Sequence, residues 1–322
     1  MGSDGAALTR PVLVTGAGGF VGSAVVRALV AGRVGHVVAL VRPAGTLERL
    51  EELTPSPDWQ VARGDITDHA VFAALLKELR PCAVVHVALD PRAERDPTEE
   101  SWREFVDQPL ETIFAALREV PGARLVTTGS ASVLPPGDSL HEELEPSPSA
   151  TYPEYAKLKL YEERRIAEIG ARAGVPWMHL RLFYMFGKYE SQRRLLPHIV
   201  RHLLANEPAE LSSGAQVRDF TDVDDVAGAY VRALEASEDR CGRVYHVGSG
   251  RGISVRAFAM EVAGVLGREE LLRFGSAAHA DTEARAVIAD VSRAARELDW
   301  AASSDTRERI RRVTRWWIGR SG

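Results

Sequence analysis

The sequence predicts an α/β protein with a Rossmann-type doubly wound parallel sheet and a smaller C-terminal α/β cap. From Pro11 onward, short β-branched runs alternate with helical stretches, which is the order of βαβ units in a parallel sheet. A glycine-rich turn at residues 16–22 joins the first of these runs to the first helix. The chain has 322 residues, 45% of them hydrophobic and 26% charged, so it is long enough to bury a core of this size.

Strands and helices follow one another at short intervals through the first half of the chain. We expect strands at residues 12–15, 37–40, 60–62, 83–87, 124–127 and 177–182, and a later one at 243–247. The intervening stretches predict helices, among them 20–31, 70–79 and 109–120. Residues 134–153 are rich in Pro, Ser and Glu and follow a strand end, which predicts a surface loop at the rim of the ligand crevice.

The glycine-rich turn has the context of a dinucleotide-binding loop. Gly16 permits the tight turn, Gly19 lets the backbone approach a pyrophosphate, and Gly22 permits close packing of helix on strand. Phe20 and Val21 open the helix, whose N-terminus attracts anionic phosphate. A structural turn without a ligand is the alternative, and the strand before and the helix after it disfavour that interpretation.

The end of the second strand bears on which dinucleotide is bound. An acidic residue there would accept hydrogen bonds from the ribose hydroxyls of NAD, whereas this chain reads Ala-Leu-Val-Arg-Pro at 39–43. Arg42 favours a 2′-phosphate, and so we expect NADP(H) to be preferred over NAD(H). An exposed arginine that is merely solvated is the alternative.

Three side chains predict proton-transfer chemistry at the sheet edge. Tyr155 and Lys159 are four residues apart on one helix face, where a neighbouring ammonium favours the phenolate form of tyrosine. Ser130 follows the strand at 124–127, at the carboxyl edge where ligands of such sheets bind, and it can polarise a substrate oxygen. Ser132 is a second candidate for that role.

The alternation loosens after Arg181, which indicates a second structural part. We expect a dinucleotide-binding domain at residues 11–180, with 217–248 returning to it, and a substrate-binding cap formed by 181–216 and 249–322. No linker polar enough to separate independent domains is present, so the two parts are expected to share one crevice.

Composition disfavours several classes of partner. The formal net charge of -5 gives no basic stripe for a nucleic acid. The two cysteines, Cys82 and Cys241, are far apart, so we expect no metal site. No stretch approaches the roughly 20 apolar residues of a membrane span, and we expect a cytoplasmic protein.

Five motifs occur together in a fixed order along the chain. They are the loop at 15–22, Gly-Asp-Ile at 64–66, His-Val-Ala at 86–88, Ser130 with Tyr155 and Lys159, and Arg-Asp-Phe at 218–220 followed by Val-Asp-Asp at 223–225. With these motifs, nearly the whole chain resembles an extended short-chain dehydrogenase/reductase of the NAD-dependent epimerase/dehydratase family.

The resemblance implies roles for individual residues. Ser130, Tyr155 and Lys159 would form the catalytic triad, with Lys159 also holding the nicotinamide ribose. Further cofactor contacts are implied for Asp65, Ile66, Val87 and Ala88, of which Asp65 would meet the adenine edge. Arg218 would anchor the diphosphate of a nucleotide sugar, with Ser130, Ser132 and Tyr184 as further substrate contacts. The family also leads us to expect a homodimer.

Departures from the family's patterns narrow the reaction. Sugar 4,6-dehydratases carry Asp-Glu where this chain has Ala131 and Ser132, and many 4-epimerases carry Asn where it has Tyr184. The stretches 182–187, 195–197 and 214–220 are similar to NADPH-dependent ketoreductases of nucleotide-linked sugars. We therefore expect NAD(P)H-dependent reduction of the 4-keto group of a nucleotide-linked 4-keto-6-deoxyhexose, with Tyr155 as the acid.

Three alternatives remain at this point. The first is a nucleotide-sugar 4-epimerase that retains tightly bound NAD. The second is a reductase of small carbonyl compounds that carry no nucleotide. The third is a non-catalytic dinucleotide sensor, which the intact set of Ser130, Tyr155 and Lys159 disfavours.

Overall fold

The computed structural model describes residues 8–276 and 285–320, so residues 277–284 and 321–322 of the expected cap lie outside it. The strands are β1 (Leu8–Thr15), β2 (Gly35–Val41), β3 (Trp59–Arg63), β4 (Ala83–His86), β5 (Arg124–Ser130), β6 (Gly137–Leu140), β7 (Trp177–Leu182), β8 (Tyr184–Phe186), β9 (Ala209–Leu211), β10 (Val217–Asp222), β11 (Arg243–Val247), β12 (Gly252–Ser254), β13 (Leu272–Phe274) and β14 (Ala286–Ala289). The helices are α1 (Phe20–Ala31), α2 (His69–Leu79), α3 (Pro91–Arg95), α4 (Glu99–Trp102), α5 (Gln108–Arg118), α6 (Pro153–Ala173), α7 (Leu195–Leu204), α8 (Val223–Glu235), α9 (Val255–Leu266), α10 (Ser292–Leu298) and α11 (Thr306–Arg320).

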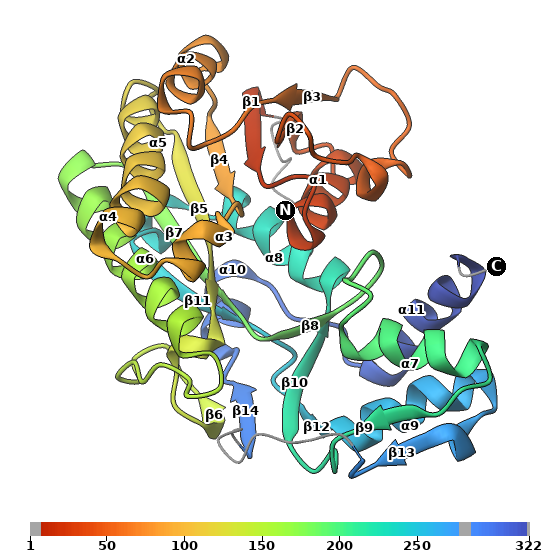
Figure 1. Cartoon of the computed structure of the whole chain (residues 1–322). Coiled ribbons are helices and arrows are strands. Elements are labelled where there is room, and N and C mark those ends of the chain that lie inside the picture. Colours follow the sequence, from red (N-terminus) through yellow and green to blue (C-terminus); the bar gives the residue numbers. More distant parts are fainter. Residues whose placement is uncertain (1–7, 277–284, 321–322) are drawn as a thin grey trace.

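The larger sheet has seven strands in the order β11-β7-β5-β4-β1-β2-β3, and every neighbouring pair is parallel (Figure 1). The order runs outward in both directions from β1 and β4, as in a doubly wound sheet. The predicted Rossmann-type fold class is therefore confirmed. In such sheets, ligands bind beyond the carboxyl ends of the strands at this reversal point, which here lies between Thr15 and His86.

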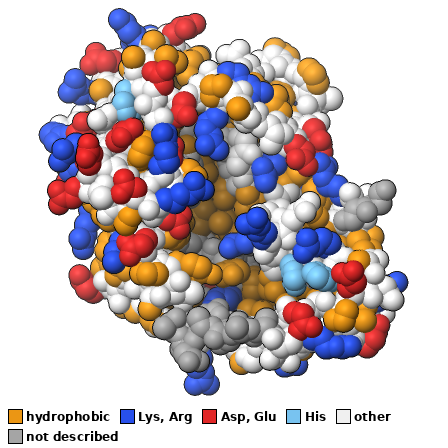
Figure 2. Space-filling model, viewed as in Figure 1, with side chains coloured by type: hydrophobic (Ala, Val, Ile, Leu, Met, Phe, Trp, Pro, Cys, Tyr) orange, Lys and Arg blue, Asp and Glu red, His pale blue; other side chains and the backbone are white. Residues whose placement is uncertain are grey.

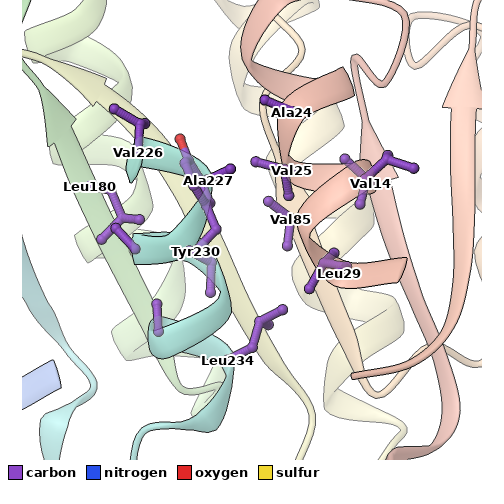
Figure 3. Packing of buried hydrophobic residues seen from close by; sticks show 14 of the residues in the cluster. Val14, Ala24, Val25, Leu29, Val85, Leu180, Val226, Ala227, Tyr230 and Leu234 are labelled. Carbon is purple, nitrogen blue, oxygen red and sulfur yellow. The ribbon is translucent and has the colours of Figure 1, made fainter. Parts of the chain in front are cut away.

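Both faces of this sheet are covered, which explains why its strands are apolar throughout. Successive residues of β1 point to opposite faces, so Val12 and Val14 enter one core while Leu13 enters the other, and all three are fully buried. The first core includes side chains of α1 and α8, as Figure 3 shows for Val25 and Tyr230. The second is covered by α2, α5 and α6.

A second sheet of five strands combines segments between Gly137 and Ala289. Its strand order is β12-β10-β14-β6, with β8 paired to β10, and β9 pairs separately with β13. Helices α7, α9 and α11 pack in a third core, as the lower right of Figure 1 shows. Segment 217–248 starts in this sheet as β10 and continues through α8 to β11 of the larger sheet. The domain boundaries expected from the sequence stay a prediction.

The segment 134–153 differs in part from the expected surface loop. Residues 137–140 form β6, which pairs in parallel with β14, a strand almost 150 positions later in the chain. Leu140 is buried in a small core with Phe183 and Ala289, and these partners explain the ordered strand. The rest of the segment remains irregular and, as described below, borders the larger cavity.

Candidate active site

Two cavities open at the reversal point of the larger sheet. The larger one, of about 690 Å³, runs from the glycine-rich loop to the second sheet, and the smaller one, of about 440 Å³, lies beyond β2 and β3. Figure 2 shows a hollow in this part of the molecule, with hydrophobic side chains inside it and Lys and Arg side chains around its mouth.

Every site residue predicted from the sequence lines one of these two cavities. The larger cavity is lined by Gly16, Gly19, Phe20, Val21, Gly22, Val87, Ser130, Ser132, Tyr155, Lys159, Tyr184 and Arg218. The smaller one is lined by Gly16, Gly19, Arg42, Asp65, Ile66, Val87 and Ala88. Residues more than 200 positions apart in the sequence therefore meet at one continuous site.

The glycine-rich loop has no room for side chains at its two ends. Gly16 has φ +67°, and a Cβ there would lie 2.8 Å from the backbone nitrogen of Ala88. A Cβ on Gly22 would lie 2.2 Å from the carbonyl oxygen of Gly16. Gly19 is the N-cap of α1 and offers no side-chain cap, and the first turn has no acidic residue. The helix N-terminus thus faces the cavity with uncapped backbone N–H groups, which fits a dinucleotide diphosphate.

Thr15 and His86 join the ends of β1 and β4 beneath this loop. The Thr15 hydroxyl lies 2.9 Å from His86 Nδ1 and accepts hydrogen bonds from the backbone nitrogens of Val87 at 3.2 Å and Ala88 at 3.3 Å. Burial, together with the charge of Lys159, lowers the pKa of His86 to about 3. His86 is therefore a neutral, packed residue that shapes the floor of the site.

The smaller cavity is shaped by hydrogen bonds within the chain. The Arg63 guanidinium donates to the carbonyl oxygens of Arg42 at 3.1 Å and Gly45 at 2.6 Å, which fixes the turn after β2. Asp65 accepts from the backbone nitrogen and hydroxyl of Thr67, at 3.0 and 2.9 Å. Asp90 also lines the cavity, and its hydrogen bonds with Arg92 hold the pKa of this carboxyl below its usual value.

Ser130, Tyr155 and Lys159 come from two adjacent elements. Ser130 ends β5, and its hydroxyl accepts a hydrogen bond from the backbone nitrogen of Ser132 at 3.2 Å. Tyr155 and Lys159 lie in the first two turns of α6, and Lys159 is only 5% exposed. Its ammonium donates to the Thr128 carbonyl oxygen at 2.8 Å and to the Glu162 carboxylate at 2.5 Å.

The charge of Lys159 is kept by its neighbours. Burial by itself lowers the pKa of Lys159, but the carboxylate of Glu162 and the nearby Tyr155 outweigh that effect and raise it above its usual value. The ammonium is therefore charged throughout the physiological range.

The Ser132 hydroxyl is buried, and the residues that the structure describes offer it no hydrogen-bond partner. It can therefore bind a ligand in the cavity that it lines.

The far end of the larger cavity contains two guanidinium groups. Arg218 lies in β10, is 6% exposed and donates to the Val217 carbonyl oxygen at 2.8 Å. Arg194 precedes α7 and lies 5.3 Å from the ring centre of Tyr184, which in turn packs edge-on against Phe220. No motif or spacing in the sequence indicates Arg194 as a site residue.

Asp219, next to Arg218, has a structural role. It is fully buried and accepts hydrogen bonds from the backbone nitrogens of Ser249 at 2.6 Å, Gly250 at 3.0 Å and Ala289 at 3.2 Å. This carboxylate joins β10 to the turn after β11 and to β14, and thereby holds Arg218 at the cavity wall.

Comparison with known proteins places this geometry in a family. The model of the NAD dependent epimerase/dehydratase family matches residues 12–248. The chain belongs to this family. Its architecture is that of the extended short-chain dehydrogenases/reductases, with the glycine-rich loop, Tyr155 and Lys159 inside the matched region.

Several proteins with different names are similar to the chain at low identity. A dTDP-glucose 4,6-dehydratase of Neisseria meningitidis serogroup B is 25% identical over 340 residues, which cover 96% of this chain and 93% of that protein. A UDP-glucose 4-epimerase of Bos taurus is 26% identical over 351 residues, covering 96% and 97%. The solved structure of MoeE5 in complex with UDP-glucose and NAD is 28% identical and has a TM-score of 0.76. That match covers 97% of this chain and 99% of the MoeE5 chain.

The described residues contain neither a metal-binding cluster nor a membrane-spanning helix. No group of three or more His, Cys, Asp or Glu side chains in residues 8–276 and 285–320 is arranged to hold a metal ion. Within the same residues, no helix has both the length and the apolar character needed to cross a bilayer.

Proposed function

We propose that the protein reduces the 4-keto group of a nucleotide-linked 4-keto-6-deoxyhexose with NADPH, and that Tyr155 supplies the proton. The observation that carries this proposal is the meeting of Ser130, Tyr155 and Lys159 with the uncapped N-terminus of α1 in one cavity. A dinucleotide diphosphate and a substrate carbonyl can be held there together.

The residues have distinct tasks in this reaction. Bound NADPH supplies the hydride that adds to the ketone carbon. Tyr155 donates its phenolic proton to the oxygen, which becomes the alcohol, and Ser130 hydrogen-bonds the same oxygen as negative charge develops on it. The fixed charge of Lys159 stabilises the phenolate that remains until Tyr155 is reprotonated.

Arg218 and Arg194 are suited to the nucleotide part of the substrate. Their guanidinium groups carry fixed positive charge at the far end of the cavity, and a guanidinium fork matches the oxygens of a diphosphate. A nucleotide sugar would extend from these two residues to Ser130 and Tyr155. The family members named above support this substrate class, since dTDP-glucose and UDP-glucose occur in their names.

The preference for NADPH rests on Arg42. It lines the smaller cavity, where Arg63 holds the turn that carries it, and no acidic residue ends β2. The carboxylate of Asp90 in the same cavity is paired with Arg92, at 3.0 and 2.9 Å, so its repulsion of a phosphate is reduced. A 2′-phosphate beside Arg42 would therefore pair with its guanidinium and be repelled less by Asp90.

A 4-epimerase that retains NAD is the second candidate. It is favoured by the UDP-glucose 4-epimerase relative and by the NAD in the MoeE5 complex. Dehydration has less support, because Ala131 and Ser132 occupy the positions of the Asp-Glu pair and neither can act as a general acid or base there.

The deciding experiment measures the nicotinamide cofactor of the purified protein. Mass spectrometry of the released cofactor is followed by fluorescence titration of the protein with NADPH and NADH. An exchangeable site that prefers NADPH, and consumption of NADPH with a nucleotide-linked 4-keto-6-deoxyhexose, support the reductase. Tightly held NAD and conversion of UDP-glucose without net use of cofactor support the epimerase.

Two variants sharpen this test. Arg42→Ala should weaken NADPH binding at least about tenfold and leave NADH binding unchanged, whereas Arg118→Ala, an exposed arginine on α5, should change neither. Arg218→Ala should abolish nucleotide-sugar binding. Turnover of small carbonyl compounds that survives Arg218→Ala would instead favour the reductase without a nucleotide handle. Size-exclusion chromatography with light scattering tests the expected homodimer.

A further inference from the structure

Glu162 forms a buried ion pair with Lys159 directly behind the cavity. The carboxylate lies 2.5 Å from the ammonium, and the two side chains are only 4% and 6% exposed. Tyr155, Lys159 and Glu162 occupy positions i, i+4 and i+7 of α6, so they share one face of the helix. The pair therefore belongs to the same row of side chains as the proposed proton donor.

The contacts of Lys159 determine where its last donor can point. An ammonium has three N–H donors, and the Thr128 carbonyl and the Glu162 carboxylate accept two of them. One donor remains for a ligand in the cavity that Lys159 lines. Without Glu162, the flexible side chain of Lys159 would have one fixed contact instead of two.

The neighbouring carboxylate does not share this task. Glu163 turns away from Lys159 and binds the Arg181 guanidinium through both oxygens, at 2.8 and 2.5 Å. A buried carboxylate is costly to desolvate, and an ion pair of this kind is often no more stable than an apolar pair. Stability alone therefore does not account for the charge of Glu162.

We infer that Glu162 is a positioning residue for hydride chemistry: it fixes the Lys159 ammonium and offsets part of the positive charge that Lys159 exerts on the Tyr155 hydroxyl. This inference rests on the proposed function, because it takes Tyr155 as the proton donor. Glu162 thereby sets the pH range in which Tyr155 is protonated and the reduction can proceed.

The other charged groups around this row do not change their charge between pH 7 and 10. Burial lowers the pKa of His86 on β4 to about 3 and that of His179 on β7 to about 4, so both are neutral. Arg181 on β7 and Glu163 on α6 neutralise each other in their own pair. Burial raises the pKa of Tyr230 on α8 well above its usual value. A change in the titration of Tyr155 can therefore be assigned to Glu162.

The size of the effect follows from the helix geometry. Seven residues at a rise of about 1.5 Å each separate Tyr155 from Glu162 by about 10 Å along the axis. At an effective dielectric constant of about 20, a unit charge at that distance moves a titration by about one pH unit. Loss of the Glu162 charge should shift the titration of Tyr155 downward, because Lys159, whose charge Glu163 and the Tyr155 phenolate also favour, would then stabilise that phenolate without the opposing charge of Glu162.

The test is a spectroscopic titration of tyrosinate between pH 7 and 10 in the full-length protein without substrate. Each variant is measured against the same variant carrying Tyr155→Phe, so the difference reports Tyr155 alone. Burial raises the pKa values of Tyr161 and Tyr189 to about 12, which keeps their signal out of this range. The variants are Glu162→Gln, Glu162→Asp, which keeps the charge, and Glu154→Gln.

Glu154 is the matched control because it forms an exposed i,i+3 pair with Lys157 on the same helix, at 3.1 Å. We expect a downward shift of about one pH unit for Glu162→Gln, and much smaller shifts for Glu162→Asp and Glu154→Gln. Coinciding titrations of wild type and Glu162→Gln would overturn the inference. If Glu162→Gln does not fold, Glu162→Met replaces it, and failure of both neutral variants beside a folded Glu162→Asp would show a purely structural role and also reject the inference.

The proposed function can fail separately from this inference. If Tyr155→Phe retains full reductase activity, the assignment of the proton donor is wrong whatever the titrations show. If Tyr155→Phe is inactive but Glu162→Gln leaves the titration in place, only the role given to Glu162 is wrong.

Discussion

Replacing Asp219 by Asn should destabilise the protein more than its isosteric shape suggests. One carboxylate oxygen of Asp219 accepts hydrogen bonds from the backbone nitrogen and the hydroxyl of Ser249, both at 2.6 Å. The other accepts from the backbone nitrogens of Gly250 at 3.0 Å and Ala289 at 3.2 Å. An amide has one acceptor oxygen, so in either orientation its NH₂ group must face donors of the chain.

The expected loss follows from the number of donors left without an acceptor. Leaving a buried N–H group unsatisfied costs about 1–3 kcal/mol. With the NH₂ group toward Gly250 and Ala289, two such groups lose their partner, which gives about 2–6 kcal/mol. The amide is neutral and avoids the cost of burying the charge of the carboxylate, which offsets part of this loss. We therefore expect a decrease of about 3 kcal/mol in the free energy of unfolding.

Urea unfolding followed by far-UV circular dichroism and tryptophan fluorescence measures this difference. Asp290→Asn is the control, since the Asp290 carboxylate is only partly buried and its hydrogen bonds come from a single residue, Ser292, whose backbone nitrogen lies at 2.8 Å. Its variant should lie within about 1 kcal/mol of wild type. A free energy of unfolding for Asp219→Asn within about 0.5 kcal/mol of wild type, at an unchanged m-value, would refute the role given to Asp219.

Three further outcomes follow from the site and its surroundings. Gly22→Ala places a Cβ 2.2 Å from the Gly16 carbonyl oxygen and should lower the free energy of unfolding by about 3 kcal/mol. In the control Gly228→Ala the new Cβ meets nothing closer than 3.6 Å, so the free energy of unfolding should rise by up to about 1 kcal/mol. Equal urea midpoints of the two variants would contradict this expectation. Burial raises the pKa of Glu190 from 4.5 to about 7, so the folded protein binds more protons than the unfolded chain in that window and loses stability as pH rises through it. Glu190→Gln should therefore be more stable than wild type at pH 8 by roughly 3 kcal/mol and similar to it at pH 4, and equal urea midpoints of the two at pH 8 would count against this. Tyr155→Phe should lower kcat at least about a hundredfold and leave the Kd for NADPH unchanged, and a loss below about tenfold would be inconsistent with proton donation by Tyr155.

Local patterns in the sequence predicted much of the fold and the candidate site. The bounds of α1, β7 and β11 agree with those expected from the sequence. The glycine spacing and the four-residue step from Tyr155 to Lys159 depend on backbone geometry within one loop and one helix. Ser130 was recognisable because it follows a strand in a parallel sheet, where strand ends gather at one edge.

Other parts of the site depend on contacts between distant segments. Strand β6 was expected to be loop because its partner, β14, lies far along the chain and its pairing has no local pattern. Arg194 reaches the cavity only because α7 starts beside Tyr184. Periodicity reports which residues share a face, but not which distant face they meet.

The sequence by itself determined the doubly wound class, the glycine-rich loop at the N-terminus of α1, and the set of side chains capable of proton transfer. All of these depend on residues close together in the chain, where φ, ψ and the helical step decide the geometry. Only the tertiary structure decided that Glu162, and not the adjacent Glu163, pairs with Lys159. The 100° turn between the two glutamates sends one toward Lys159 and the other toward Arg181, and the packing of α6 on the sheet sets which is which.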